Sequence, residues 1–201
     1  MAPSSTIRSV CVFCGSREGA QPVYRDAAAR LAGELARRGV TLVFGGGRVG
    51  LMGVLADTAL AAGGEAIGVM PRALVEREIA HLRLTRLHIV GTMHERKQLM
   101  ADLADAFVLL PGGFGSWDEF CEIVTSLQLG IHAKPCGILN AAGYYAPLLA
   151  QIERAVGDGF IDDSRARSIL VDDEPESLIA RLSASARPLP ARATPSPFPY
   201  T

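Results

Sequence analysis

Short apolar segments alternate with longer amphipathic segments along most of the chain, and this alternation restricts the possible folds more than any other feature. Strands are predicted at residues 7–13, 40–44, 66–70, 87–90, 106–110, 135–140 and 168–171. Helices are predicted at residues 21–38, 51–62, 93–103, 117–129, 144–156 and 175–182. Such alternation is typical of a parallel sheet covered by helices on both faces. The sequence therefore predicts an α/β fold, a Rossmann-like doubly wound sheet in a single domain.

Length and composition agree with one domain followed by a tail. The chain has 201 residues, of which 49% are hydrophobic, and this is enough for one domain with a full core. We expect the domain to span residues 1–183. Residues 184–201 contain five prolines and little apolar content, so a disordered, proline-rich tail is predicted there.

Charge and hydropathy argue against several classes of function. The formal net charge of −1 gives no support for a nucleic-acid partner or an anionic membrane surface. No window approaches about 18 uninterrupted apolar residues, and residues 1–6 lack the pattern of a signal peptide. Cys11 and Cys14 have the spacing of a redox motif, but they lie in or at the end of an apolar strand, and no second close pair of cysteines occurs. We therefore expect a cytoplasmic protein with buried cysteines and no metal.

Glycine clusters follow three predicted strands, at Gly15, residues 45–50 and residues 112–115. In a parallel sheet, ligands bind at the carboxyl ends of the strands. Residues 106–110 run into Pro-Gly-Gly-x-Gly and then into the helix predicted at 117–129, so backbone N–H groups and the helix dipole favour a phosphate there. Asp118 and Glu119 are expected in the first turn of that helix. This stretch predicts a phosphate site beside an acid, and hence chemistry on a phosphorylated sugar.

The motif Gly45-x-Gly47-x-x-Gly50 matches the dinucleotide-binding pattern, which is weak by itself. The acid that would bind the ribose is missing, because the following strand ends at Val69-Met70-Pro71. A nicotinamide or flavin is therefore disfavoured, and no cofactor is expected. Gly46 and Gly47 are interpreted instead as backbone that approaches a phosphate or nucleoside closely. Tight turns without a ligand are the alternative.

Charged residues near these glycines allow two interpretations each. Arg96 and Lys97 lie at the start of a predicted helix, where cations oppose the helix dipole, and this conflict favours a ligand role. A solvated pair of charges is the alternative. Glu119 is a candidate for catalysis, but Ser116 and Glu119 also have the spacing of a capping box, in which Ser116 caps the helix.

Five segments occur in an order and at a spacing that resemble the LOG ("Lonely guy") proteins, which are cytokinin riboside 5′-monophosphate phosphoribohydrolases. They are FCGS (13–16), FGGGRVGLMG (44–53), MHERK (93–97), PGGFGSWDE (111–119) and LGIHAKPCGILN (129–140). The resemblance covers roughly residues 7–182, and MHERK together with PGGFGSWDE is its specific part. Some relatives carry an older lysine-decarboxylase label. That chemistry is disfavoured, because only two lysines occur and no constellation for pyridoxal phosphate is visible.

The resemblance implies a homodimer that hydrolyses the N-glycosidic bond of N6-modified AMP, releasing the free base and ribose 5-phosphate. It implies that Arg96 and Glu119 are catalytic. It also implies a substrate site lined by Glu78, Lys97, Gly113, Phe114, Gly115, Ser116, Trp117, Asp118 and Thr125. A less selective AMP or nucleotide nucleosidase and a nucleotide-binding module without hydrolysis are the alternatives.

Three positions depart from the family pattern. Ser116 replaces the usual threonine and keeps its hydroxyl, and Asp118 replaces a glutamate. Trp117 replaces a smaller apolar residue, commonly leucine. These departures leave the chemistry in place and affect the shape of the base pocket, and therefore the substrate preference.

Overall fold

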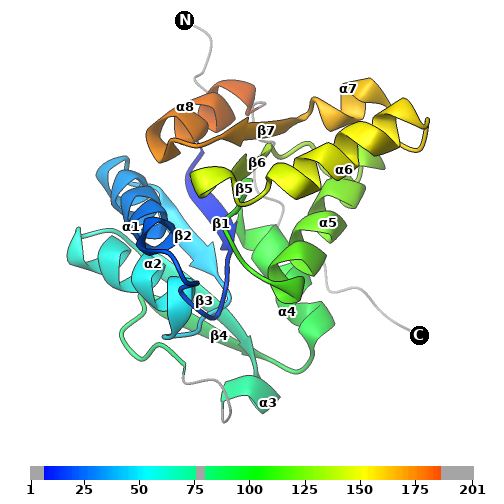
Figure 1. Cartoon of the computed structure of the whole chain (residues 1–201). Helices are drawn as coiled ribbons and strands as arrows, with labels where there is room; N and C mark the ends of the chain where they lie inside the picture. The colour runs from blue at the N-terminus through cyan, green and yellow to red at the C-terminus, as the bar shows by residue number, and fades with distance from the viewer. Residues whose placement is uncertain (1–6, 76–79, 187–201) are drawn as a thin grey trace, which may run out of the picture.

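Seven parallel strands form one sheet in the computed structural model, which describes residues 7–75 and 80–186. The strands are β1 (Ser9–Phe13), β2 (Thr41–Phe44), β3 (Ala66–Pro71), β4 (Arg86–Val90), β5 (Ala106–Leu109), β6 (Cys136–Leu139) and β7 (Ile169–Asp172). Their order in the sheet is β4-β3-β2-β1-β5-β6-β7 (Figure 1). Strands β2, β3 and β4 thus follow one another on one side of β1, and β5, β6 and β7 follow one another on its other side. The predicted doubly wound α/β fold is confirmed.

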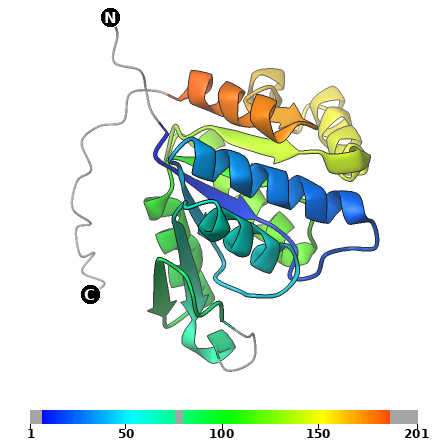
Figure 2. The same ribbon diagram turned by 90° about the vertical axis from the view of Figure 1, so that its left-hand side faces the viewer.

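Helices cover both faces of this sheet. They are α1 (Pro22–Arg37), α2 (Gly50–Ala61), α3 (Arg72–Val75), α4 (Met93–Leu103), α5 (Phe114–Gln128), α6 (Ala146–Gly157), α7 (Asp163–Ala166) and α8 (Pro175–Ser185), with a 3-10 turn at Ala141–Gly143. Helices α1, α2 and α8 lie side by side over one face (Figure 2). Helices α4, α5 and α6 pack on the other face. The four-residue helices α3 and α7 are too short for a periodic pattern to predict.

The alternation of side chains along β1 divides the core into two layers. Val10 and Val12 pack with α1, α2 and α8, whereas Cys11 and Phe13 pack with α4 and α5. All five residues of β1 are buried, as expected for a strand with neighbours on both sides and helices on both faces. In the part of the chain that the structure describes, no helix is long and apolar enough to cross a membrane.

Helix α5 begins three residues earlier than predicted. Gly113 is the residue before its first turn, and the N–H of Trp117 donates the first helical hydrogen bond to the Gly113 carbonyl, at 3.1 Å. The prediction that Asp118 and Glu119 lie in the first turn is therefore wrong, since the second turn contains them. Gly113, the residue before the helix, has an extended backbone.

The predicted capping box at Ser116 and Glu119 is also wrong. Ser116 is the third residue of α5 and buried, and no side chain caps this helix. A side-chain cap occurs instead at α4, where the hydroxyl of Thr92 accepts from the N–H of Glu95 at 3.1 Å. The Glu95 carboxylate in turn accepts from the N–H of Gly91 at 2.8 Å. Glu119 is thereby free of a capping role.

Helix α8 ends at Ser185, two residues beyond the predicted domain boundary. The predicted tail falls almost entirely on residues 187–201, which lie outside the described residues. Between β3 and β4 the chain contains α3 and, at Ala80, an antiparallel bridge to Gly47.

Candidate active site

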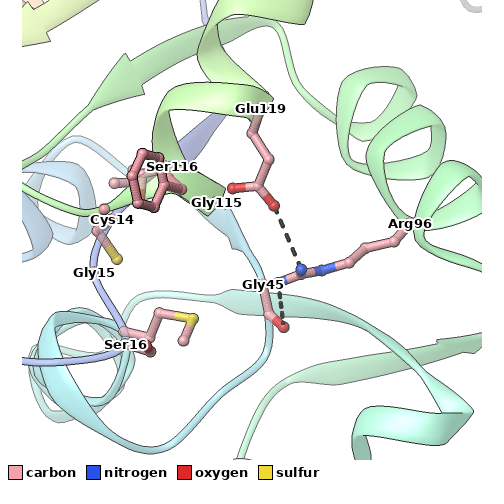
Figure 3. Close-up of a pocket in the computed structure, with 12 residues that line it drawn as sticks. Cys14, Gly15, Ser16, Gly45, Arg96, Gly115, Ser116 and Glu119 are labelled. Atoms are coloured by element: carbon pink, nitrogen blue, oxygen red, sulfur yellow. Dashed lines mark hydrogen bonds and ion pairs between the residues drawn. The ribbon is translucent and has the colours of Figure 1, made fainter.

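A cavity of about 230 Å³ opens at the carboxyl ends of β1, β2 and β5 (Figure 3). This is where the chain switches direction in the sheet, between β1 and β5, and ligands of doubly wound folds bind at such points. The cavity is lined by Val12, Cys14, Gly15, Ser16, Gly45, Met52, Arg96, Gly113, Phe114, Gly115, Ser116 and Glu119.

Arg96 crosses from α4 to the ends of two strands. Its Nε donates to the carbonyl of Val69 at 3.1 Å, and its Nη2 donates to the carbonyl of Gly45 at 3.2 Å. A Cβ at Gly45 would lie 2.1 Å from Nη2, so only glycine leaves room for the guanidinium. The side chain is 10% exposed. The two carbonyls hold Arg96 in place and leave Nη1 directed at the cavity.

Glu119 points into the cavity toward Arg96 (Figure 3). Its Oε1 lies 3.5 Å from Nη1 of Arg96, and its side chain is 11% exposed. Burial raises the pKa of Glu119 above its usual value, and the nearby Arg96 partly offsets this. A buried carboxyl with a raised pKa keeps its proton to a higher pH than an ordinary glutamate, and groups of this kind serve as general acids or bases.

The start of α5 supplies hydrogen-bond donors at the cavity wall. The N–H groups of Phe114, Gly115 and Ser116 precede the first helical hydrogen bond, so they have no partner within the helix. All three residues line the cavity. The positive end of the helix dipole points the same way, and an anion such as a phosphate is favoured there.

The loop before α5 is held by contacts from distant parts of the chain. The N–H of Gly15 donates to the carbonyl of Pro111 at 3.0 Å. The hydroxyls of Tyr144 and Tyr145 donate to the carbonyls of Gly112 and Leu110, both at 2.7 Å. These bonds fix the donors of α5 relative to β1.

The glycine-rich segment 45–50 touches the cavity through Gly45. The carbonyl of Gly46 accepts from the N–H of His81 at 3.0 Å, and Gly47 forms the bridge to Ala80. Gly50 adopts φ = +61°, and a Cβ there would lie 2.2 Å from the carbonyl carbon of Ser16. The segment therefore packs against its neighbours, and Gly46 and Gly47 lie beside the cavity without lining it.

Three more of the predicted substrate-binding residues do not line the cavity, namely Lys97, Asp118 and Thr125. Lys97 forms ion pairs with Asp118 at 3.2 Å and with Glu122 at 2.5 Å. The hydroxyl of Thr125 donates to the carbonyl of Cys121 in the preceding turn of α5, at 2.7 Å. Glu78 lies outside the described residues.

Phe114 lines the cavity and packs against Trp117. Their rings meet edge to face with centroids 5.3 Å apart. Phe114 is 86% exposed, whereas Trp117 is 38% exposed. The pair places an aromatic surface beside the cavity, which suits contact with a planar or apolar part of a ligand.

Several lining residues were not among the predicted site residues, namely Val12, Cys14, Gly15, Ser16, Gly45 and Met52. The segment 13–16 belongs to the family resemblance, and its place after the first strand is the signal that could have found it. Burial and the nearby Glu119 raise the pKa of the Cys14 thiol, which keeps it protonated. Among residues 7–75 and 80–186, no cluster of three or more His, Cys, Asp or Glu side chains could hold a metal.

Solved structures with the same fold include a binding protein and a carrier protein of the molybdenum cofactor. The chain is similar to the molybdenum cofactor binding protein from Rippkaea orientalis, with a TM-score of 0.68 and 21% identity over 90% of this chain and 98% of that one. It is also similar to the molybdenum cofactor carrier protein from Chlamydomonas reinhardtii, with a TM-score of 0.67, 18% identity and the same coverage. At this identity the likeness shows the fold alone.

Sequence comparisons identify much closer relatives. Residues 52–182 match a family described as "Possible lysine decarboxylase". The chain is 48% identical over 178 residues to the probable cytokinin riboside 5′-monophosphate phosphoribohydrolase LOGL9 of Oryza sativa subsp. japonica, covering 89% of this chain and 78% of the relative. It is 44% identical over 178 residues to the cytokinin riboside 5′-monophosphate phosphoribohydrolase LOG7 of Arabidopsis thaliana, covering 89% of this chain and 82% of the relative. This chain belongs to the LOG family, the family of the cytokinin riboside 5′-monophosphate phosphoribohydrolases.

Proposed function

We propose that this protein hydrolyses the N-glycosidic bond of N6-modified adenosine 5′-monophosphates, the cytokinin riboside 5′-monophosphates, to the free base and ribose 5-phosphate. One observation carries the proposal: a buried Arg96–Glu119 pair shares a cavity with the free N–H groups of α5. An anion site beside a carboxylate and a cation matches a substrate with a phosphate, a ribose and a departing base. The names of the relatives support the same reaction.

Glu119 acts on the ribose. Cleavage of the bond between C1′ and the base nitrogen develops positive charge on the sugar ring, as in other glycoside hydrolyses. The Glu119 carboxylate stabilises that charge and orients or deprotonates the attacking water. Its burial serves this role, because an electrostatic interaction is stronger where water is excluded.

Arg96 acts on the departing base. The base leaves with an excess of negative charge, which the guanidinium neutralises by hydrogen bonding. A guanidinium is a poor proton donor because its usual pKa exceeds about 12. Arg96 therefore stabilises the leaving group, and its bonds to Val69 and Gly45 fix it for that purpose.

The 5′-phosphate binds at the start of α5. The N–H groups of Phe114, Gly115 and Ser116 are the donors, and the helix dipole adds to their attraction. The aromatic pair of Phe114 and Trp117 contacts the base or its N6 substituent.

The lysine decarboxylase description does not fit the lysines of this chain. A lysine that forms a Schiff base with pyridoxal phosphate needs a lowered pKa. The ion pairs of Lys97 with Glu122 and Asp118 raise its pKa instead. Lys134 donates to the carbonyl of Ala101 at 2.7 Å and does not line the cavity.

The proposal includes a homodimer that works in the cytoplasm, as the family resemblance implies. Light scattering on the purified full chain measures the oligomer directly. A mass of two chains is expected, and a monomer at assay concentration contradicts the dimer without affecting the chemistry.

Product analysis tests the reaction. Purified protein is incubated with AMP and with N6-isopentenyl-AMP, and mass spectrometry measures free base and ribose 5-phosphate. Release of both products from the isopentenyl nucleotide, lost in Glu119→Gln, is the expected result. Equal turnover of AMP indicates a less selective nucleosidase. Tight binding of nucleotide without base release contradicts the proposal and indicates a binding module.

A further inference from the structure

A second cluster of charges lies beside the Arg96–Glu119 pair. It consists of Lys97 on α4 with Asp118 and Glu122 on α5, and is called the Lys97 cluster below. The ammonium of Lys97 lies 3.2 Å from Oδ2 of Asp118 and 2.5 Å from Oε2 of Glu122. Its side chain is 20% exposed, whereas those of the two acids are more exposed. None of the three lines the cavity.

The cluster joins the two helices that carry the proposed catalytic pair. Lys97 follows Arg96 on α4, and Asp118 precedes Glu119 on α5. Neighbouring residues on a helix point about 100° apart. The Arg96–Glu119 pair therefore faces the cavity, while the Lys97 cluster links α4 and α5 along an adjacent side.

The position of Glu119 depends more on the link between α4 and α5 than the position of Arg96 does. Arg96 is bound to the carbonyls of Val69 and Gly45, at the ends of two strands. Among the described residues, the one ion-pair partner of Glu119 is Arg96, at the long distance of 3.5 Å. Where Glu119 sits is therefore set by where α5 sits relative to α4.

We propose that Lys97 and Glu122 are positioning residues, which hold α5 against α4 and set the charge around Glu119 without touching the substrate. This inference rests on the proposed role of Glu119 in catalysis. It gives Lys97 a function different from the substrate-binding role that the family resemblance implies, and it adds Glu122 to the residues on which the reaction depends.

The charges of the cluster also act on Glu119 directly. Lys97 lowers the pKa of Glu119, as Arg96 does, whereas Asp118 and Glu122 raise it. The groups that face Glu119 are Arg96 and Lys97 from α4, Asp118 and Glu122 from α5, and the protonated thiols of Cys14 and Cys11 from β1. Removing the positive charge should therefore raise the pKa of Glu119, and removing the Glu122 charge should lower it.

Two variants with opposite expected effects test the inference. In Lys97→Met, Asp118 and Glu122 repel each other one turn apart on α5, because like charges four residues apart destabilise a helix. We expect kcat to fall about tenfold, as a displaced catalytic group predicts, while KM for the nucleotide and inhibition by ribose 5-phosphate stay within about twofold. The acid limb of the pH profile, where kcat/KM falls as Glu119 is protonated, should move to higher pH. In Glu122→Gln the limb should move to lower pH.

The matched control is Asp102→Asn, which removes a carboxylate from α4 outside the cluster. Asp102 accepts from the side-chain amide of Gln98 at 2.8 Å on the exposed face of the helix. We expect its acid limb and kcat to match those of the unmodified protein. A shift of the same size in Asp102→Asn would mean that general charge, and not the cluster, moves the pKa of Glu119.

A readout that does not need turnover separates this inference from the proposed function. NMR titration of ¹³C-labelled glutamate carboxyls, assigned with Glu119→Gln, follows the pKa of Glu119 in each variant. Opposite shifts in Lys97→Met and Glu122→Gln support the inference even if no base is released, in which case the proposed function alone fails. Unchanged titration of Glu119, or a tenfold rise of KM in Lys97→Met with an unmoved acid limb, overturns the inference and makes Lys97 a substrate ligand.

Discussion

A methyl group added at Gly45 is the sharpest perturbation of the candidate active site. Gly45 does not have a positive φ, so its backbone accepts alanine without strain. The new Cβ would lie 2.1 Å from Nη2 of Arg96, whereas real Cβ atoms essentially never approach another atom within 3.0 Å. The guanidinium must therefore retreat by about 0.9 Å or more from its present position.

The retreat has two measurable consequences. Arg96 loses its hydrogen bond to the carbonyl of Gly45, and its bond to Val69 weakens. A hydrogen bond to a charged group contributes about 1.5–3 kcal/mol, and we expect the free energy of unfolding to fall by about that much. A displacement of roughly 1 Å at a catalytic group costs about 100-fold in rate, so kcat for the nucleotide should fall by about that factor.

The assay measures base release for Gly45→Ala, Arg96→Ala and the double variant, together with denaturant unfolding of each. Because the methyl group acts through Arg96, it should cost little activity once Arg96 is removed, and the two effects should be strongly non-additive. Gly33→Ala is the control, since a Cβ there meets nothing within 4 Å on α1. Additive losses in the double variant, or full activity in Gly45→Ala, would refute the reasoning.

Three further predictions concern single side chains. Glu119→Gln should lower turnover by at least about 100-fold with a normal melting temperature. In the unmodified protein the rate should rise with pH through a pKa above that of an ordinary glutamate, because burial raises the pKa of Glu119 and delays its ionisation. Hydrogen bonds from Arg37 and Arg38 lower the pKa of Glu34 to about 2. The stabilisation that Glu34 gives should therefore be full at neutral pH and lost as the pH falls toward 2. The melting temperature of Glu34→Gln should differ from that of the unmodified protein at pH 7, and the two temperatures should converge at pH 2. Trp117→Leu removes the edge-to-face partner of Phe114, worth about 0.5–1.5 kcal/mol; we expect the ratio of kcat/KM for AMP and N6-isopentenyl-AMP to change severalfold, and an unchanged ratio would exclude the aromatic pair from base recognition.

Local pattern was sufficient for the fold class. The inner strands are largely buried, and helices such as α1 and α5 are amphipathic, so the alternation of short apolar and longer amphipathic segments is visible in the sequence itself. The glycines after the strands were also visible, and a parallel sheet places all strand ends on one edge. The location of a site near Gly15, Gly45 and Gly113 could therefore be predicted from the chain alone.

Contacts between distant residues decided the rest. Helix α5 begins at Phe114 and not at Trp117, and the loop before it is held by hydrogen bonds from Tyr144 and Tyr145, which follow β6. No local pattern contains those hydrogen bonds. The predicted capping box failed because the helix begins earlier: Ser116 and Glu119 have the right spacing, but Ser116 is already the third residue of α5.

The sequence by itself determined which residue types stand at the strand ends, and the family motifs named Arg96 and Glu119. Only the tertiary structure decided that Gly45 and Val69 hold the guanidinium, that Glu119 faces it at 3.5 Å, and that Lys97 faces acids instead of the cavity. The physical reason is that a hydrogen bond or ion pair forms or is lost when the distance between its two atoms changes by a few tenths of an ångström. Those distances follow from strand order and helix packing, which no spacing along the chain records.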